Sequence, residues 1–226
     1  MKAKVLSVAV VLAVMAFLAS ARQAKADTLT LDNGGSITMG GVYVGPYNFT
    51  GSNGLSGSLQ LVCDTFQYEV HSGEYWDVTV NAFPTGMGYA NPSATTAQID
   101  EVGWLVEHMF QNLGNTTLVG QLQWAIWEIL DPTDVLSSSY YNSISSSDKT
   151  QITYWASTYW TPANIAIAEA GNYSNLVVYE PVAGTQVPVG DGPPQEYIGI
   201  VPEPAVLSLL AIGLFGLIGF RRRFAY

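Results

Sequence analysis

The sequence predicts an α+β fold: one domain of β-sandwich or barrel strands with an inserted helical layer, flanked by a signal peptide and a C-terminal transmembrane helix. Three observations lead to this prediction. The first half of the chain is rich in short runs of β-branched and aromatic residues. The middle, residues 95–170, places apolar residues at spacings of three and four, which is typical of helices. Strand-like runs then return near residue 200.

The expected strands are short and separated by turn residues. One run alternates apolar and polar residues from Trp76 to Val80, the period of a half-buried strand. Asn53 and Gly54 predict a turn, and residues 84–92 form a Gly/Pro-rich loop. The predicted strands are residues 42–44, 47–50, 59–64, 65–71, 75–83 and, after the helical region, 175–182 and 195–200.

The helical region has clear boundaries. Asp131 and Pro132 end its second helix, because the residue before a proline avoids the helical conformation. Thr161 is a suitable N-cap for the last helix, with Pro162 at the first helical position. A polar, serine-rich linker is expected at residues 137–147. The four predicted helices are residues 95–113, 117–130, 148–160 and 162–170.

The N-terminus indicates export. Two lysines precede an apolar run over residues 5–18, and Ala24 and Ala26 are small residues suited to cleavage. We therefore assign residues 1–26 to a signal peptide. An earlier cut, after Ala21, is the alternative.

The expected ectodomain, residues 27–200, is strongly acidic. It contains 17 acidic residues and one basic residue, Lys149, which gives a formal net charge of −16. Nucleic acids and anionic lipids are bound mainly through Lys and Arg. The composition therefore excludes a nucleic-acid partner.

The C-terminal segment, residues 201–226, has three parts in a fixed order. They are the tetrapeptide Val201, Pro202, Glu203 and Pro204, an apolar run over residues 205–220, and the basic cluster Arg221, Arg222 and Arg223. The apolar run predicts a membrane segment, and the arginines predict a cytoplasmic stop. Together the parts resemble the PEP-CTERM sorting signal of Gram-negative bacteria. The alternative is an ordinary membrane anchor.

That resemblance implies a route for the protein. An exosortase would recognise the Pro-Glu-Pro segment, and the chain would be held in the inner membrane at least transiently. It would then be displayed at the cell surface or released outside the cell.

Two further segments carry the candidate chemistry. Cys63, the only cysteine, lies in LVCD at residues 61–64, and Gln123 lies in LQWAIW at residues 122–127. Together these segments resemble the two motifs of bacterial thioester domains, which occur in surface adhesins. The first match is looser, because valine precedes the cysteine and aspartate follows it.

The resemblance implies an internal thioester that joins Cys63 to Gln123. Asp64, Trp124 and Trp127 would form its environment, and Phe66 would help the tryptophans to exclude water. An amine- or hydroxyl-bearing surface or matrix component would take the acyl group once, so the protein would not be an enzyme. We expect no cofactor and no metal, because the chain has no Cys/His cluster and no calcium or phosphate loop.

The residues alone leave alternatives open. Cys63 is also explained as a small buried hydrophobe or as half of an intermolecular disulfide, and Gln123 as a polar position on a core helix. The protein would then be a non-covalent structural or matrix protein of the envelope or a biofilm. A secreted hydrolase would need two opposed carboxylates, for which the candidates are Glu69, Glu74, Glu101 and Glu107.

Aromatic pairs offer another kind of partner. They lie around the serine-rich segment, where they would either pack or stack on sugar rings of an extracellular polysaccharide. The pairs are Tyr140 with Tyr141, Tyr154 with Trp155, and Tyr159 with Trp160.

Overall fold

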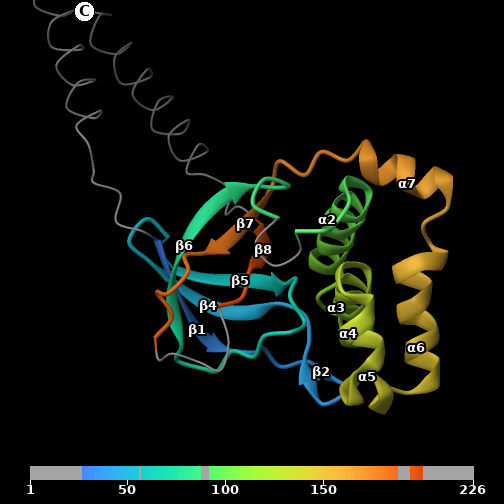
Figure 1. Ribbon diagram of the computed structural model, residues 1–226, viewed down its shortest axis with the longest axis horizontal. Helices are drawn as coiled ribbons and strands as arrows, with labels where there is room; N and C mark the ends of the chain where they lie inside the picture. The colour runs from blue at the N-terminus through green and yellow to red at the C-terminus, as the bar shows by residue number, and fades with distance from the viewer. Residues whose placement is uncertain (1–26, 56, 88–91, 188–193, 201–226) are drawn as a thin grey trace, which may run out of the picture.

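A closed antiparallel barrel forms one side of the described molecule, and the helices form the other (Figure 1). The computed structural model describes residues 27–55, 57–87, 92–187 and 194–200. Around the barrel the strands follow the order β1-β4-β5-β8-β7-β6. Their bounds are β1 (Asp27–Asn33), β4 (Tyr47–Ser52), β5 (Gly57–Cys63), β6 (Tyr75–Ala82), β7 (Leu176–Pro181) and β8 (Tyr197–Ile200). A small hairpin of β2 (Thr38–Met39) and β3 (Val42–Tyr43) lies between β1 and β4 in the chain.

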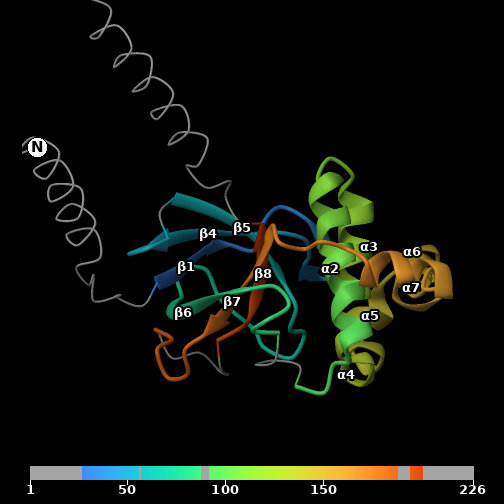
Figure 2. The same cartoon turned by 90° about the horizontal axis from the view of Figure 1, so that it is seen from above.

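The helices form one insertion between β6 and β7, and they cover one side of the barrel (Figures 1 and 2). A short π-helix, η1, follows α6 without a break. The bounds are α2 (Thr96–Gln111), α3 (Thr116–Leu130), α4 (Pro132–Ser137), α5 (Ser139–Ser143), α6 (Ser146–Thr153), η1 (Tyr154–Thr158) and α7 (Pro162–Glu169). The predicted α+β class, with barrel strands and an inserted helical layer, is confirmed.

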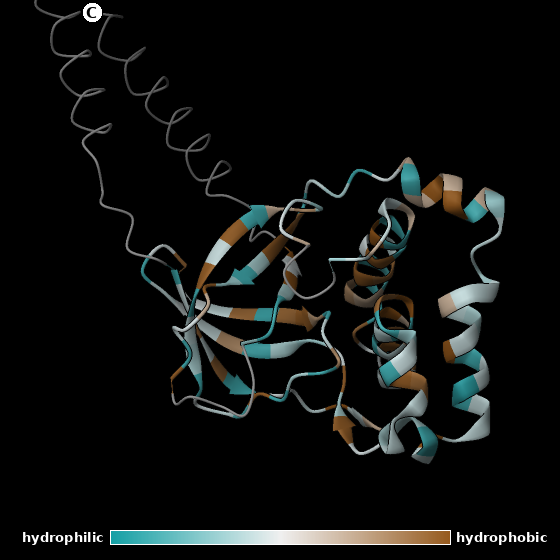
Figure 3. Ribbon diagram, viewed as in Figure 1, coloured by the Kyte–Doolittle hydropathy of each residue, from teal (hydrophilic) through white to brown (hydrophobic). Residues whose placement is uncertain are grey.

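The buried residues form two clusters. Hydrophobic and hydrophilic residues alternate along strands of the barrel (Figure 3). On β5, Leu61 and Cys63 belong to the cluster inside the barrel, whereas Val62 packs against the helices. On β8, Tyr197 is inside and Ile198 faces the helical layer. This is the period of two expected of a strand with both faces covered. It places the Cys63 side chain at the interior end of β5.

Helix α3 is buried on nearly every side, which is expected of a helix that is apolar all around. The Asn115 side chain caps its start by accepting from the Leu118 backbone N–H at 3.1 Å. Its end at Leu130 precedes Asp131 and Pro132, as predicted. Trp124 and Trp127 of α3 belong to the barrel cluster, so this helix closes the end of the barrel interior.

Helix α2 is tied to α3 through its own cap. Thr95 and Gln98 form a reciprocal capping box at the start of α2. The Gln98 amide also donates to the Ile129 carbonyl at 2.9 Å. One side chain thus fixes both the start of α2 and its position beside α3.

Two sequence predictions are wrong. Residues 65–71 were expected to form a strand, but they form a loop, because β8 already occupies the edge of β5 that such a strand would need. The predicted linker at 137–147 contains α5, whose N-cap Ser138 accepts from the Tyr141 N–H at 3.0 Å. The serines there cap helices instead of extending a loop.

Candidate functional site

Cys63 is the last residue of β5, where it pairs with Tyr197 of β8. Its side chain is 1% exposed and is a free thiol. The thiol donates toward the Thr65 carbonyl, with Sγ 3.0 Å from the oxygen. Sγ also lies 3.3 Å from Oε1 of Gln195. Two acceptors therefore compete for the proton of one buried thiol.

The structure brings Gln123 to Cys63 across 60 positions of sequence. Gln123 lies in the middle of α3 and is fully buried. Its Nε2 donates to the main-chain carbonyl of Cys63 at 2.6 Å, and its Oε1 is buried without a hydrogen-bond partner among the described residues. The amide hydrogen bond links the middle of α3 to the end of β5.

Further polar side chains gather at the same place. Asp64 is 1% exposed, Thr65 5%, Gln195 4% and Glu196 0%. The Thr65 hydroxyl donates to Asp64 at 3.1 Å, and the Tyr197 hydroxyl donates to Oε1 of Gln195 at 2.7 Å. We call Cys63, Asp64, Thr65, Gln123, Gln195 and Glu196 the buried polar cluster. It lies where the ends of β5 and β8 meet α3.

The sequence motifs do not indicate Thr65, Gln195 or Glu196 as site residues. Gln195 and Glu196 come 132 and 133 residues after Cys63 and reach it only because β8 pairs with β5. No local pattern predicts that pairing. The one available signal was the polar Gln-Glu pair directly before an apolar strand.

Charge and burial act together on the ionisable groups. Burial, and then the neighbouring Asp64, raise the pKa of the Cys63 thiol, and contacts with Thr65, Trp127 and Gln195 offset only part of that rise. Burial also raises the pKa of Asp64, whose carboxyl is hydrogen-bonded to that of Glu196. Burial therefore favours the uncharged forms of both the thiol and the Asp64 carboxyl.

Aromatic rings from the loop after β5 and from α3 pack together in the same core as Cys63. Phe66 lies 5.4 Å from Trp124 and 5.3 Å from Trp127, measured between ring centroids, and the two tryptophans are 5.2 Å apart. Trp124 is fully buried and Trp127 is 3% exposed. Phe66 is half-buried against this core.

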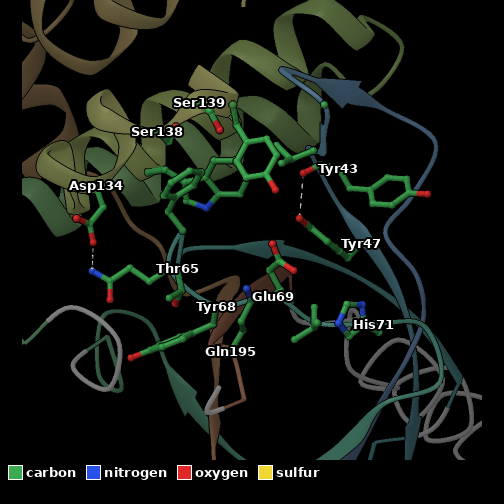
Figure 4. Close-up of a pocket in the computed structure, with 17 residues that line it drawn as sticks. Tyr43, Tyr47, Thr65, Tyr68, Glu69, His71, Asp134, Ser138, Ser139 and Gln195 are labelled. Atoms are coloured by element: carbon green, nitrogen blue, oxygen red, sulfur yellow. Dashed lines mark hydrogen bonds between the residues drawn. The ribbon is translucent and has the colours of Figure 1, made fainter. Parts of the chain in front are cut away.

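A pocket of about 720 Å³ lies beside the cluster (Figure 4). Three of its lining residues, Thr65, Trp127 and Gln195, also interact with Cys63. The other walls come from β3, the loop after β5 and helices α4 and α5, and they include the exposed carboxylates of Glu69 and Asp134. The pocket therefore shares part of its lining with the surroundings of the sulfur.

The remaining predicted groups lie apart from the cluster. His71 lines the outer pocket, whereas His108 stacks on Trp104 at 4.8 Å in the helical layer. Tyr154, Trp155, Tyr159 and Trp160 form a ring cluster with Trp104, and Tyr140 lines the pocket. Within the described part of the chain, no group of His, Cys, Asp or Glu side chains is arranged to hold a metal ion.

Comparison with known proteins identifies the end of the chain. Residues 201–223 match the PEP-CTERM protein-sorting motif. The chain therefore carries an export and membrane-associated sorting signal, as predicted. The motif covers Val201, Pro202, Glu203 and Pro204, together with Arg221, Arg222 and Arg223.

The structure does not describe the two ends of the chain. The predicted cleavage residues Ala24 and Ala26 and the predicted transmembrane segment lie outside the described residues. None of the helices that are described has the length and apolar character needed to cross a membrane.

Comparisons of the rest of the chain with known proteins give one similar structure. No curated protein matches the sequence. Among solved structures, the chain is similar to the N-terminal thioester domain of the fibronectin-binding protein SfbI from Streptococcus pyogenes. The two are 14% identical, the match covers 81% of this chain and 97% of the other, and the TM-score is 0.45.

Proposed function

We propose that this exported protein attaches covalently to a partner through a thioester between Cys63 and Gln123. The observation that carries the proposal is the hydrogen bond of 2.6 Å from the Gln123 amide to the Cys63 carbonyl, made between two buried residues. It places the Gln123 carboxamide beside the main chain of the only cysteine in the sequence.

The bond would form by exchange of sulfur for nitrogen. Sγ of Cys63 attacks Cδ of Gln123, the C–N bond breaks, and the thiol proton leaves with the nitrogen as ammonia. An amine of the partner then attacks Cδ and the C–S bond breaks. One amine proton passes to Sγ, which leaves an amide on Gln123 and a free Cys63 thiol. Each molecule reacts once, so the protein is a capture device and not an enzyme.

The surroundings of the site support such a reaction. The pocket beside the sulfur offers an approach for the partner, and its exposed carboxylates favour a cationic amine over an anionic group. Lys149, the only lysine between residues 27 and 200, is engaged elsewhere. Its Nζ donates to the Asn142 carbonyl at 3.0 Å and lies 5.4 Å from the Tyr141 ring centroid.

The sorting motif supports a site of action at the cell surface or in the surrounding matrix. Exosortase processing would release the domain from the inner membrane to the surface of a Gram-negative cell or to the surrounding matrix. There the partner would be an amine- or hydroxyl-bearing surface component, with polysaccharide as a further contact. Adhesion or biofilm cohesion would be the result.

Capture of methylamine by the full chain tests the proposal. We expect digestion and mass spectrometry to find one methylamide, at Gln123, together with a newly free Cys63 thiol. The Cys63→Ala and Gln123→Glu variants should capture nothing, because one lacks the sulfur and the other has no ammonia to lose.

Gln121→Glu is the matched control for this experiment. Gln121 is also a buried glutamine of α3, but its amide binds Asp148 at 2.9 Å. Capture should persist in this variant. A wild-type chain that takes up no methylamine, and whose thiol is free from the start, would leave only a non-covalent structural role.

A further inference from the structure

The pocket beside the buried polar cluster is larger than a simple amine needs. Its volume of about 720 Å³ lies within the range of roughly 300–1,000 Å³ that is typical of pockets for drug-sized ligands. Methylamine, or the end of a lysine side chain, would occupy only a small part of it. The pocket therefore has room for a ligand that contains a ring.

Aromatic side chains form much of the pocket lining. Phe66 and Tyr68 come from the loop after β5, Tyr43 from β3 and Tyr140 from α5. Tyr43 is 52% exposed and Tyr140 is 42% exposed, so neither ring is used up by packing in the core. A tyrosine offers an apolar face to the C–H groups of a sugar and a hydroxyl at its edge for hydrogen bonds.

The charge of the pocket selects among sugars. The lining that the structure describes contains two carboxylates and no lysine or arginine. Asp134 is already engaged, because it accepts from the Gln67 amide at 2.6 Å. Glu69 is exposed, its carboxylate projects into the pocket, and no described group donates to it (Figure 4). An ammonium group would supply that partner, whereas a uronate, sulfate or phosphate would be repelled.

A peptide amine fits these walls less well. Peptides that dock on β-sheets commonly add a strand at a free edge, and the closed barrel has none. A lysine side chain would also leave the hydroxyl groups of Ser138, Ser139 and Tyr140 in the lining without a partner. Sugar hydroxyls match them, because a hydroxyl both donates and accepts.

We propose that this pocket binds an amino sugar with a free amine, as one unit of a de-N-acetylated polysaccharide, with its ring against Tyr140 and its ammonium group at Glu69. The inference rests on the proposed function in one respect: a polymer held here would bring further amines of its own chain to the thioester. The binding itself is non-covalent and needs no thioester.

Binding is measured by calorimetry on the full chain with Cys63→Ala, which cannot form the thioester. The probes are a glucosamine oligomer, the same oligomer fully N-acetylated, and an oligolysine of equal length. We expect the glucosamine oligomer to bind more tightly than either of the others by about tenfold, the effect of losing a hydrogen bond to a charged group or the contacts of the sugar ring. Equal or tighter binding of the N-acetylated oligomer would exclude recognition of the amine, and equal or tighter binding of oligolysine would make the pocket a peptide site. Either result would overturn the inference.

Two variants of the Cys63→Ala chain locate the bound sugar. Glu69→Gln removes the charge and should weaken binding about fivefold, as for an ion pair that stays partly hydrated. Tyr140→Ala removes the ring and should weaken binding about tenfold. Both side chains are exposed, so neither change should unfold the chain.

Matched controls lie outside the pocket. Glu169→Gln changes an exposed carboxylate at the end of α7, and Tyr154→Ala removes a tyrosine of η1 that is 39% exposed. Both should bind the glucosamine oligomer as tightly as their parent. If the Glu69 and Tyr140 variants also do so, the sugar binds elsewhere and the inference is wrong.

The wild-type chain separates this inference from the proposed function. Sugar binding by the Cys63→Ala chain without methylamine capture by wild type would keep the sugar site and end the thioester proposal. Methylamine capture without sugar binding would do the reverse. Where both occur, digestion of wild type should find the glucosamine oligomer joined to Gln123, and its absence would show that the bound polymer is not the acceptor.

Discussion

At Cys63, burial and the neighbouring Asp64 act in the same direction, since both raise the pKa of the thiol. A more basic thiolate is a poorer leaving group. A thioester at this position would consequently survive longer than one whose sulfur ionises easily. The residues that make the free thiol unreactive would protect the bond until an acceptor enters the pocket.

Asp64→Asn tests this protection. Removing the carboxyl lowers the pKa of Cys63, so the thioester should be lost to water and small amines faster, by roughly tenfold for about 1.4 kcal/mol of transition-state free energy. The measurement is the half-life of the Cys63–Gln123 link in buffer. Asp32→Asn, at an exposed carboxyl on β1, should leave the half-life unchanged. A longer half-life in Asp64→Asn would contradict the account.

Among the single residues of the candidate site, the sequence indicated those on α3 but not those next to β8. The glutamine and its tryptophans were found because α3 presents them together within one motif. The sulfur's closest side-chain partner, Gln195, was missed because it belongs to a strand from the far end of the chain. Spacing along a sequence does not report which strands pair in a barrel.

Among the elements, α2 carries a carboxyl whose ionisation opposes folding. Partial burial raises the pKa of Glu101 to about 7, from an ordinary value of 4.5. Between these two pH values the folded chain binds more protons than the unfolded chain, so the free energy of unfolding falls as pH rises. Asp64, Asp100 and Glu128 also have raised pKa values and contribute with the same sign.

Glu101→Gln should therefore flatten part of the pH dependence of stability. Urea midpoints measured from about pH 4.5 to about pH 8 should decline less in this variant than in wild type. Glu107→Gln, on the same helix, is the control and should retain the wild-type decline. A Glu101→Gln chain with an undiminished slope would show that another group is responsible.

The boundaries of the helices were more predictable than the partners of the strands. Asn115, Asp131 and Thr161 cap helices through local hydrogen bonds, so their meaning can be read within a few residues of sequence. The loop at residues 65–71 resembles a strand locally, but the closed barrel has no free edge for it. Residues 65–71 instead line one side of the pocket.

For the whole molecule, the acidic charge should direct which amines are captured. Residues 27–200 carry a formal charge of −16, and Glu69 and Asp134 face the pocket. Exposed charges act over about 10 Å at 0.1 M salt and less at higher salt. Cationic acceptors should thus be drawn to the domain mainly at low ionic strength.

Salt dependence of capture tests that expectation. The rate with a lysine peptide that carries additional arginines should fall severalfold between about 0.05 and 0.5 M sodium chloride. Hydroxylamine, which is uncharged at neutral pH, should react at a rate that salt hardly changes. Equal salt dependence for the two acceptors would exclude electrostatic guidance.

In the proposed reaction, the Cys63 sulfur and the Gln123 carboxamide carbon become bonded. The most direct measurement is mass spectrometry of the full chain, digested at mildly acidic pH without amines. The account predicts a linked pair of peptides that contain Cys63 and Gln123 and together lack one ammonia. Separate peptides with an intact glutamine, and a Cys63 that is alkylated in the native protein, would contradict it.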